Sequence, residues 1–159
     1  MKGRLVFRNR QQLYPVDLRQ LRRIARTLLV DLMVQPQFEL CVHLVAASEM
    51  TRLNRDFLGH AGSTDVITFN LAQTSQREFL YGEIFICLDD ARAQARQFHT
   101  TWQSELVRYL LHGVLHLLGY DDSKAAARRR MKQRENSLLR DLARRFPLRK
   151  LKRARRVSP

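Results

Sequence analysis

The spacing of apolar residues along the chain switches between two periods, and these periods predict alternating helices and strands. From Asp17 onward apolar residues recur every three or four positions until Gln35-Pro36, which is the period of an amphipathic helix. Residues 38–44 then alternate between apolar and polar side chains, as a half-buried strand does. His43 belongs to the polar set of this strand, so we interpret it as a structural or solvated residue.

The same patterns place the other elements. We expect strands at 4–8, 65–70 and 81–88, and helices at about 48–58 (with Ser48 as N-cap), 89–99, 102–118 and 124–143. Gly119 ends the helix at 102–118, since glycine readily adopts the left-handed conformation of helix C-termini. No repeat and no Gly/Ser linker divides the chain. We therefore predict one α/β (α+β) domain with about four strands and five helices.

Composition narrows the class of protein. The chain has 159 residues, of which 45% are hydrophobic and 28% charged, as expected for one globular domain. Charged residues interrupt every long apolar stretch, so we expect neither a membrane span nor a secretory signal. Cys41 and Cys87 lie in strand-like segments and are interpreted as buried thiols, which favours a cytoplasmic location. No apolar face accompanies the basic residues near the C-terminus, so we expect no membrane partner.

The charge is strongly positive and unevenly distributed. The formal net charge is +14, and no acidic residue follows position 143. We expect residues 1–143 to form the domain and residues 144–159 to form a basic, disordered tail. Because binding to phosphates releases condensed counterions, such a segment indicates a nucleic-acid partner. The predicted RNA-binding residues of the tail are Arg144, Arg145, Arg149, Lys150, Lys152, Arg153, Arg155 and Arg156.

The segment HGVLHLLGYDD at 112–122 carries the clearest candidate chemistry. His112 and His116 lie four residues apart, so one helix face presents both imidazoles, and helical zinc sites use this spacing. Beyond the turn at Gly119, either Asp121 or Asp122 is placed to complete a three-ligand site with an open position, the pattern of catalytic metal sites. In the alternative interpretation the histidines are unrelated and the two aspartates cap the next helix.

One position disfavours the metalloproteases and related hydrolases. A zincin-type metalloprotease places a glutamate directly after its first histidine as general base, whereas this chain has Gly113 there. A peptide or small-molecule hydrolase is therefore disfavoured. A metal site without a protein base suits a substrate that supplies its own nucleophile, as RNA does with its 2′-hydroxyl group.

Three segments resemble one known family. LLHGVLHLLGYDD resembles the HGxLHLxGYDH signature of the YbeY family, single-strand-specific endoribonucleases that act in rRNA maturation. LNRDFLGHAGSTDVITF at 53–69 is similar to that family's LNxxYRxxxxxTDVLSF segment, and GEIFICLDDA at 82–91 to its GDIxIS strand. The resemblance covers roughly residues 48–122. It implies a small mixed sheet, a bound metal ion (most often zinc) and ribosomal RNA as partner.

The resemblance assigns roles to individual residues, with one substitution among the metal ligands. His112 and His116 match two of the family's metal-binding histidines, and Asp122 stands in place of the third. Carboxylate oxygen also binds zinc, but it reduces selectivity against harder ions such as Mn²⁺. Asp121 matches the family's own aspartate and is expected to support the ligands or the turn.

A second substitution affects the binding of substrate. Leu58 stands where the family has an arginine that is thought to engage the substrate phosphate. Arg55 and His60 lie close enough along the chain to compensate. Thr64 and Asp65 match the family's Thr-Asp pair, for which we retain two interpretations: contact with substrate, or capping of a strand.

Two hypotheses of function follow. In the first, the chain is a metal-dependent, single-strand-specific endoribonuclease in rRNA maturation and ribosome assembly, with His112, His116 and Asp122 as catalytic metal ligands and Zn²⁺ as the ion. In the second, it is a catalytically impaired assembly factor that binds RNA or the ribosome through its basic surface and tail. Either function admits the small ribosomal subunit or its proteins as partners.

Overall fold

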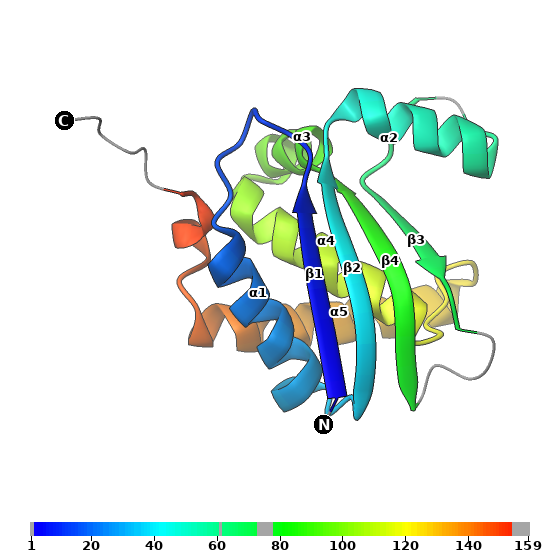
Figure 1. The fold of residues 1–159 in the computed structure, drawn as a ribbon, viewed down its shortest axis with the longest axis vertical. Coiled ribbons are helices and arrows are strands. Elements are labelled where there is room, and N and C mark those ends of the chain that lie inside the picture. The colour runs from blue at the N-terminus through cyan, green and yellow to red at the C-terminus, as the bar shows by residue number, and fades with distance from the viewer. Residues whose placement is uncertain (1, 61, 73–77, 154–159) are drawn as a thin grey trace.

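A single mixed sheet organises the chain, in a computed structural model that describes residues 2–60, 62–72 and 78–153 (Figure 1). Its strand order is β1-β2-β4-β3, and β1, β2 and β4 are parallel, whereas β3 pairs antiparallel with β4 at the edge. The strands are β1 (Lys2–Asn9), β2 (Gln37–Val45), β3 (Val66–Asn70) and β4 (Phe79–Cys87).

Five α-helices flank this sheet within the described residues, so the predicted fold class is confirmed. They are α1 (Leu18–Arg26), α2 (Ala47–Leu53), α3 (Leu88–Phe98), α4 (Trp102–Leu117) and α5 (Ala125–Arg145). Two π-helical segments, η1 (Thr27–Leu32) and η2 (Asn54–Leu58), extend α1 and α2, and a 3₁₀ turn, η3 (Leu148–Leu151), follows α5. None of the described helices combines the length and apolar character needed to cross a membrane.

The helix starts show where local signals determined the structure and where they did not. Asp17 caps α1, because its side chain accepts a hydrogen bond from the Gln20 backbone N–H at 3.1 Å. The expected cap of α2 at Ser48 is wrong. The N-cap is Ala46, two residues earlier, and the Ala47 N–H donates to the carboxylate of Asp89 on α3 at 2.7 Å. A contact across 42 residues thus replaces the local cap.

The core lies between the sheet and the layer of α1, α4 and α5 (Figure 1). Gly113 explains how closely α4 approaches β4, since a Cβ atom at that position would lie 2.9 Å from side-chain atoms of Ile84. The same position that lacks the protease base is therefore a packing position with no room for a side chain. A smaller cluster around Met50 and Phe85 packs α2 on the other face of the sheet.

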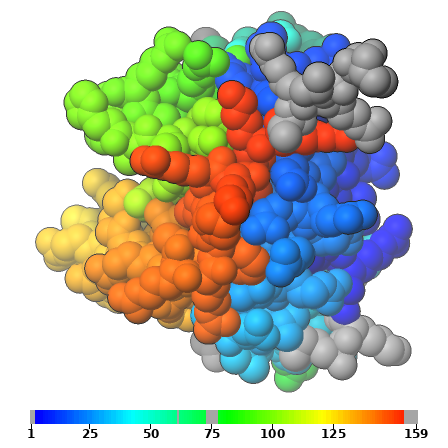
Figure 2. Space-filling model, turned by 90° about the vertical axis from the view of Figure 1, so that its left-hand side faces the viewer, coloured from blue at the N-terminus to red at the C-terminus, as the bar shows by residue number. Residues whose placement is uncertain are grey.

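The prediction of a disordered tail from residue 144 is wrong for residues 144–153. Helix α5 continues to Arg145, and Leu151 is fully buried in the core. The Leu151 carbonyl accepts a hydrogen bond from the Asp17 N–H at 2.7 Å, and Lys152 forms a β-bridge with Val16. Figure 2 shows this segment, in red, lying between α5 in orange and α1 in blue.

The physical reason is that apolar residues within the basic segment anchor it. Phe146 and Leu151 are buried, and Leu148 packs against the core cluster. Their contribution outweighs the mutual repulsion of the neighbouring cations, whose charged groups remain at the surface. The last part of the predicted tail, with Arg155 and Arg156, lies outside the described residues.

Candidate metal centre

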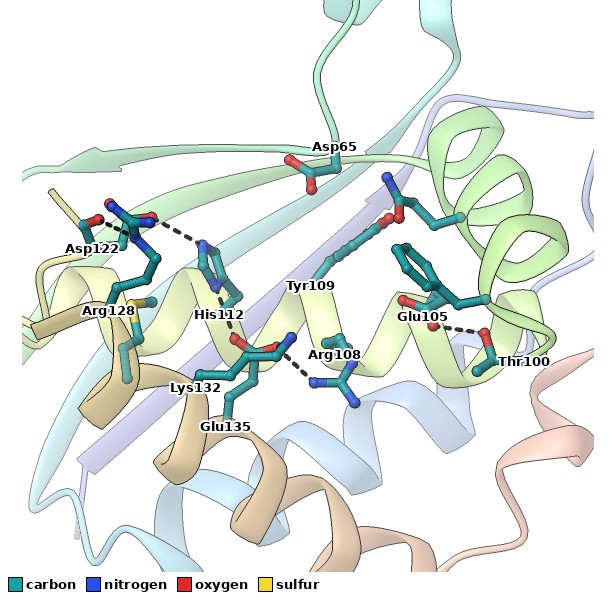
Figure 3. Close-up of a pocket in the computed structure, with 13 residues that line it drawn as sticks. Asp65, Thr100, Glu105, Arg108, Tyr109, His112, Asp122, Arg128, Lys132 and Glu135 are labelled. Atoms are coloured by element: carbon teal, nitrogen blue, oxygen red, sulfur yellow. Dashed lines mark hydrogen bonds and ion pairs between the residues drawn. The ribbon is translucent and has the colours of Figure 1, made fainter. Parts of the chain in front are cut away.

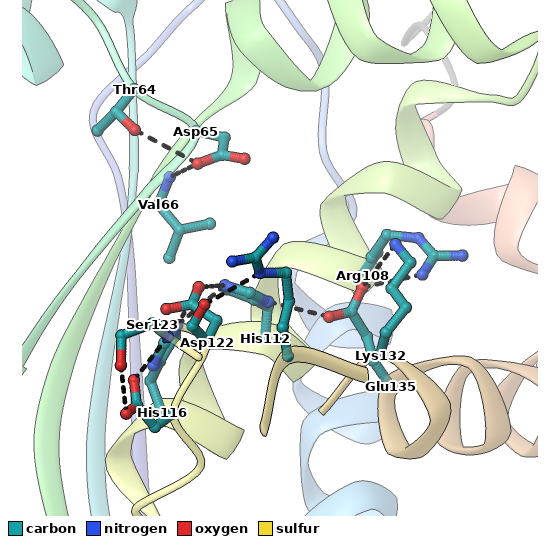
Figure 4. Close-up of polar contacts among 12 residues, drawn as sticks. Thr64, Asp65, Val66, Arg108, His112, His116, Asp122, Ser123, Lys132 and Glu135 are labelled. Atoms are coloured by element: carbon teal, nitrogen blue, oxygen red, sulfur yellow. Dashed lines mark hydrogen bonds and ion pairs between the residues drawn. The ribbon is translucent and has the colours of Figure 1, made fainter. Parts of the chain in front are cut away.

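Helix α4 and the turn that follows it bring three candidate ligands together (Figure 4). His112 and His116 lie one turn apart with their Nε2 atoms separated by 3.0 Å. Gly119 adopts a φ of +99° after the end of α4, and the chain turns back toward the helix. An Oδ2 atom of Asp122 then lies 3.4 Å from His116 Nε2 and 3.9 Å from His112 Nε2.

These separations fit a single bound ion. A zinc ion with ligand distances of about 2.0–2.1 Å places tetrahedral nitrogen and oxygen ligands roughly 3.3–3.4 Å apart. The observed distances of 3.0, 3.4 and 3.9 Å lie around that value. The largest departure is the 3.9 Å between Asp122 and His112, and the Asp122 side chain, which is 48% exposed, has the freedom to move. Two imidazoles and one carboxylate form a set of ligands that binds Zn²⁺. Because one ligand is a carboxylate, the set discriminates less strongly against harder ions.

Glu135 orients one of the histidines, and the motif did not reveal it. His112 Nδ1 lies 2.9 Å from Oε2 of this α5 residue. Because a carboxylate only accepts hydrogen bonds, Nδ1 carries the ring proton and Nε2 presents its lone pair toward His116 and Asp122. A carboxylate–histidine pair of this kind typically supports a metal ligand.

Glu135 itself is held in its charged form. Burial by itself raises the pKa of this carboxyl group, but hydrogen bonds from His112 and from Arg108 outweigh that effect and hold the pKa below its ordinary value. The Arg108 Nη1 atom lies 2.8 Å from Oε1, and Lys132 Nζ lies 3.8 Å from the same atom. The one sequence signal was spacing, since Met131, Glu135 and Leu138 share a buried helix face where an acidic residue is unusual.

Asp121 lies in the turn and takes no part in the cluster of ligands. Its carboxylate accepts hydrogen bonds from the Ser123 backbone N–H at 2.9 Å and from the Ser123 hydroxyl at 2.6 Å. These bonds lower the pKa of Asp121, whose side chain is exposed. Of the two aspartates that the sequence left open, Asp122 is the one that the structure brings to the histidines.

A cavity of about 500 Å³ adjoins this centre and is bounded by α3, α4, α5 and the start of β3 (Figure 3). His112 and Asp122 lie in its wall, and Asp65 faces it from the strand start. Asp65 also accepts a hydrogen bond from the Val66 N–H at 2.8 Å, and the Thr64 hydroxyl lies 3.4 Å from the same carboxylate oxygen. Asp65 therefore caps the strand and also faces the cavity, while Thr64 supports Asp65.

Leu58 lies beside the ligands, whereas the two residues expected to compensate for it do not. A second cavity of about 340 Å³ is lined by Leu58 together with His112, His116 and Asp122. Arg55 instead forms an exposed ion pair with Asp56 at 3.1 Å, and His60 is exposed. Neither Arg55 nor His60 lines either cavity. The structure thus gives no support to compensation by these residues.

A second group of possible ligands lies on the sheet face away from α4. His43 Nε2 is 3.3 Å from Cys41 Sγ and 3.2 Å from Glu83 Oε1. Burial raises the pKa of the Cys41 thiol, which disfavours the thiolate that a metal requires. The depression over this group is also lined by three arginines, which oppose a dication: Arg4, Arg8 and Arg10. Cys41, His43 and Glu83 therefore form a poorer metal site than the three ligands at α4.

Comparison with known proteins reveals clear sequence relatives. The profile of the family described as Endoribonuclease YbeY matches residues 6–143. A protein named Endoribonuclease YbeY from Geobacter sulfurreducens is 34% identical over 135 residues, which are 82% of this chain and 89% of that protein. Its namesake from Chlorobium luteolum is 45% identical over 93 residues, 58% of this chain and 66% of that protein.

The extent of these matches varies between relatives. For the protein of the same name from Anaeromyxobacter the identity is 41% over 102 residues, 64% of this chain and 53% of that protein. The chain thus spans between about half and two thirds of the length of several relatives that it matches. The solution structure of the Thermotoga maritima protein TM1509 superimposes with a TM-score of 0.68, at 23% identity, over 98% of this chain and 99% of that one. This last likeness shows the fold.

Proposed function

The chain belongs to the Endoribonuclease YbeY family, and on that premise we propose that it is a metal-dependent, single-strand-specific endoribonuclease that acts in rRNA maturation and ribosome assembly. The observation that carries this proposal is the convergence of His112, His116 and Asp122 beside a cavity, with Glu135 fixing the tautomer of His112. Convergence of this kind is a property of the folded chain. It goes beyond a match of sequence patterns.

In this proposal His112, His116 and Asp122 hold one divalent ion, with Zn²⁺ the first candidate. A divalent ion bound there supplies Lewis-acid polarisation of a phosphodiester oxygen. Glu135 keeps the His112 ring in the orientation that presents Nε2 to the ion. Asp65 faces the same cavity and is placed to contact the substrate.

RNA is the substrate class that the site favours. Position 113, where a zincin carries its general base, has no room for a side chain because Ile84 packs against it. The attacking group has to come from the substrate or from water, and RNA carries a 2′-hydroxyl next to each phosphodiester. The net charge of +14 attracts such a polyanion. We extend the proposal to a cytoplasmic protein that meets ribosomal RNA, and the small ribosomal subunit or its proteins, through this basic surface.

Leu58 is the one observation that favours the second candidate, a catalytically impaired factor that binds RNA or the ribosome. Its side chain gives the ligand-lined cavity an apolar wall where a cation would help to bind phosphate. In that case the basic residues would be the working part, including those of residues 144–159. The intact arrangement of the ligands and of Glu135 makes the enzyme the stronger candidate.

One experiment separates the two. Metal content is measured by elemental mass spectrometry, and cleavage is measured on matched single-stranded and duplex oligoribonucleotides. The variants are His112→Ala and, as control, His60→Ala, which removes an exposed histidine outside both cavities. We expect the parent and His60→Ala to hold close to one equivalent of metal and to cleave the single strand preferentially.

His112→Ala should lose both metal and cleavage while retaining its circular dichroism spectrum. Unchanged cleavage in His112→Ala would contradict the enzyme proposal. A parent protein that takes up neither zinc nor manganese, and binds RNA without cleaving it, would identify the binding factor instead.

A further inference from the structure

Three basic side chains line the cavity beside the candidate ligands, and they differ in their partners: Arg108, Arg128 and Lys132. Arg108 lies 2.8 Å and Lys132 3.8 Å from the same carboxylate oxygen of Glu135. Arg108 also donates to Asn136 at 2.8 Å. The charges of these two residues are thus directed toward a buried carboxylate, which leaves them less available to an anion in the cavity.

Arg128 is oriented differently. Its Nε atom donates to the backbone carbonyl of Asp122 at 3.1 Å, so the guanidinium is fixed against the loop that carries a candidate metal ligand (Figure 3). Within the described part of the chain, no carboxylate lies within ion-pair distance of Arg128. A guanidinium has five N–H donors, and this contact uses only one of them. The two terminal amino groups, the pair that grips a phosphate side by side, remain available.

The other residues around the candidate ligands make the unpaired cation of Arg128 important for binding an anionic substrate. Leu58, Val66 and Ile67 line the second cavity beside the ligands and offer no charge there. Asp65 and Asp122 line both cavities and repel an anion. A phosphodiester that approaches the ligands therefore needs a cation from the protein in addition to any bound ion, and Arg128 is the cation in position to supply it.

We propose that Arg128 forms a phosphate-binding subsite that holds a phosphodiester of single-stranded RNA against the metal centre. This inference rests on the proposed function, whose site it completes. Helix α5, rather than the segment around Leu58, then supplies the cation for the substrate. The packing of α5 across α4 places it there, since Met131 and Glu135 of the same helix contact the core and His112.

The test compares Arg128→Ala with Arg129→Ala. The control removes the same charge from the adjacent, exposed position of α5, and Arg129 lines neither cavity. Binding is measured by fluorescence anisotropy on a single-stranded 2′-O-methyl oligoribonucleotide, which lacks the free 2′-hydroxyl, over a series of salt concentrations. Cleavage kinetics on the unmodified strand and the metal content are measured in parallel.

We expect Arg128→Ala to lower kcat/KM about ten- to hundredfold, the usual range for losing a charge-assisted hydrogen bond. The slope of log Kd against log salt should decrease by roughly 0.7, the value expected when the protein neutralises one phosphate fewer on a single strand. Metal content should not change, and Arg129→Ala should match the parent. Leu58→Arg in the Arg128→Ala background should recover part of kcat/KM, because position 58 lines the ligand cavity.

Two results would overturn the inference. One is an Arg128→Ala variant with the salt slope and kcat/KM of Arg129→Ala. The other is loss of metal from Arg128→Ala, which would show that the residue only braces the Asp122 loop. A parent protein that binds the oligonucleotide without cleaving the unmodified strand would instead refute the proposed enzyme activity. The salt slopes of Arg128→Ala and Arg129→Ala would then be the remaining test of whether Arg128 binds a phosphate.

Discussion

Replacing Glu135 by glutamine tests whether a residue that no motif marks controls the candidate metal centre. The substitution preserves shape but removes the charge that faces His112 at 2.9 Å and Arg108 at 2.8 Å. A glutamine still accepts one hydrogen bond, but it no longer stabilises two positively polarised donors. The His112 ring should therefore be held less firmly, and its Nε2 atom should become a weaker ligand.

The expected magnitude follows from the position of the pair. Removal of a carboxylate that orients a metal-binding histidine typically reduces metal affinity about 10- to 100-fold, or about 1.4–2.7 kcal/mol. The free energy of unfolding should also fall by about 1–3 kcal/mol, since Arg108 would then lack its charged partner. A quarter of the Arg108 side chain is exposed (25%), so water compensates in part and the destabilisation stays below that of a fully buried pair.

The assay is a titration of the metal-free protein with Zn²⁺ against a competing chelator, with thermal melting recorded in parallel. Glu105→Gln is the matched control, because Glu105 is also buried, lines the same cavity and accepts a hydrogen bond from Thr100 at 2.7 Å. Zinc affinity should drop in Glu135→Gln and stay at the parental value in Glu105→Gln. Parental affinity in Glu135→Gln would refute the reasoning and reduce Glu135 to an ion-pair partner of Arg108.

Three further changes have definite expected outcomes. Asp122→Ala should lose the metal that elemental mass spectrometry detects in the parent. Asp122→His should bind zinc more tightly and more selectively, since imidazole suits this ion better than a carboxylate does. Equal metal content in the parent and both variants would contradict the assignment of Asp122 as a ligand. Gly113→Ala should destabilise the fold by about 1–3 kcal/mol in urea denaturation, because its Cβ would lie 2.9 Å from Ile84. Ile84→Val should recover part of that stability, whereas an unchanged stability in Gly113→Ala would show that the helix shifts freely. Burial raises the pKa of Asp90, so the ionised carboxylate weakens the fold at neutral pH. Asp90→Asn should therefore raise the Tm at neutral pH, and this gain should vanish as the pH falls below the ordinary pKa of 3.8. A difference in Tm that does not change with pH would count against burial as the cause.

The sequence predicted the elements better than their ends. Periodicity, residue composition and capping residues together identified the strands of the sheet and the α-helices that flank it, and where a period is present it reports which face of an element is buried. They misplaced the cap of α2, which depends on Asp89 from a different helix. They also misjudged residues 144–153, where Leu151 anchors a segment whose composition is otherwise that of a disordered tail.

What the sequence by itself determined about the site is its local part. Spacing of four on a helix places His112 above His116, and the left-handed turn at Gly119 returns Asp122 to them, so all three follow from neighbouring backbone conformation. Glu135 and Arg128 reach the same place only because α5 packs across α4. Such contacts depend on how two helices bury their apolar faces against each other, and no spacing along the chain encodes that crossing before the core has formed.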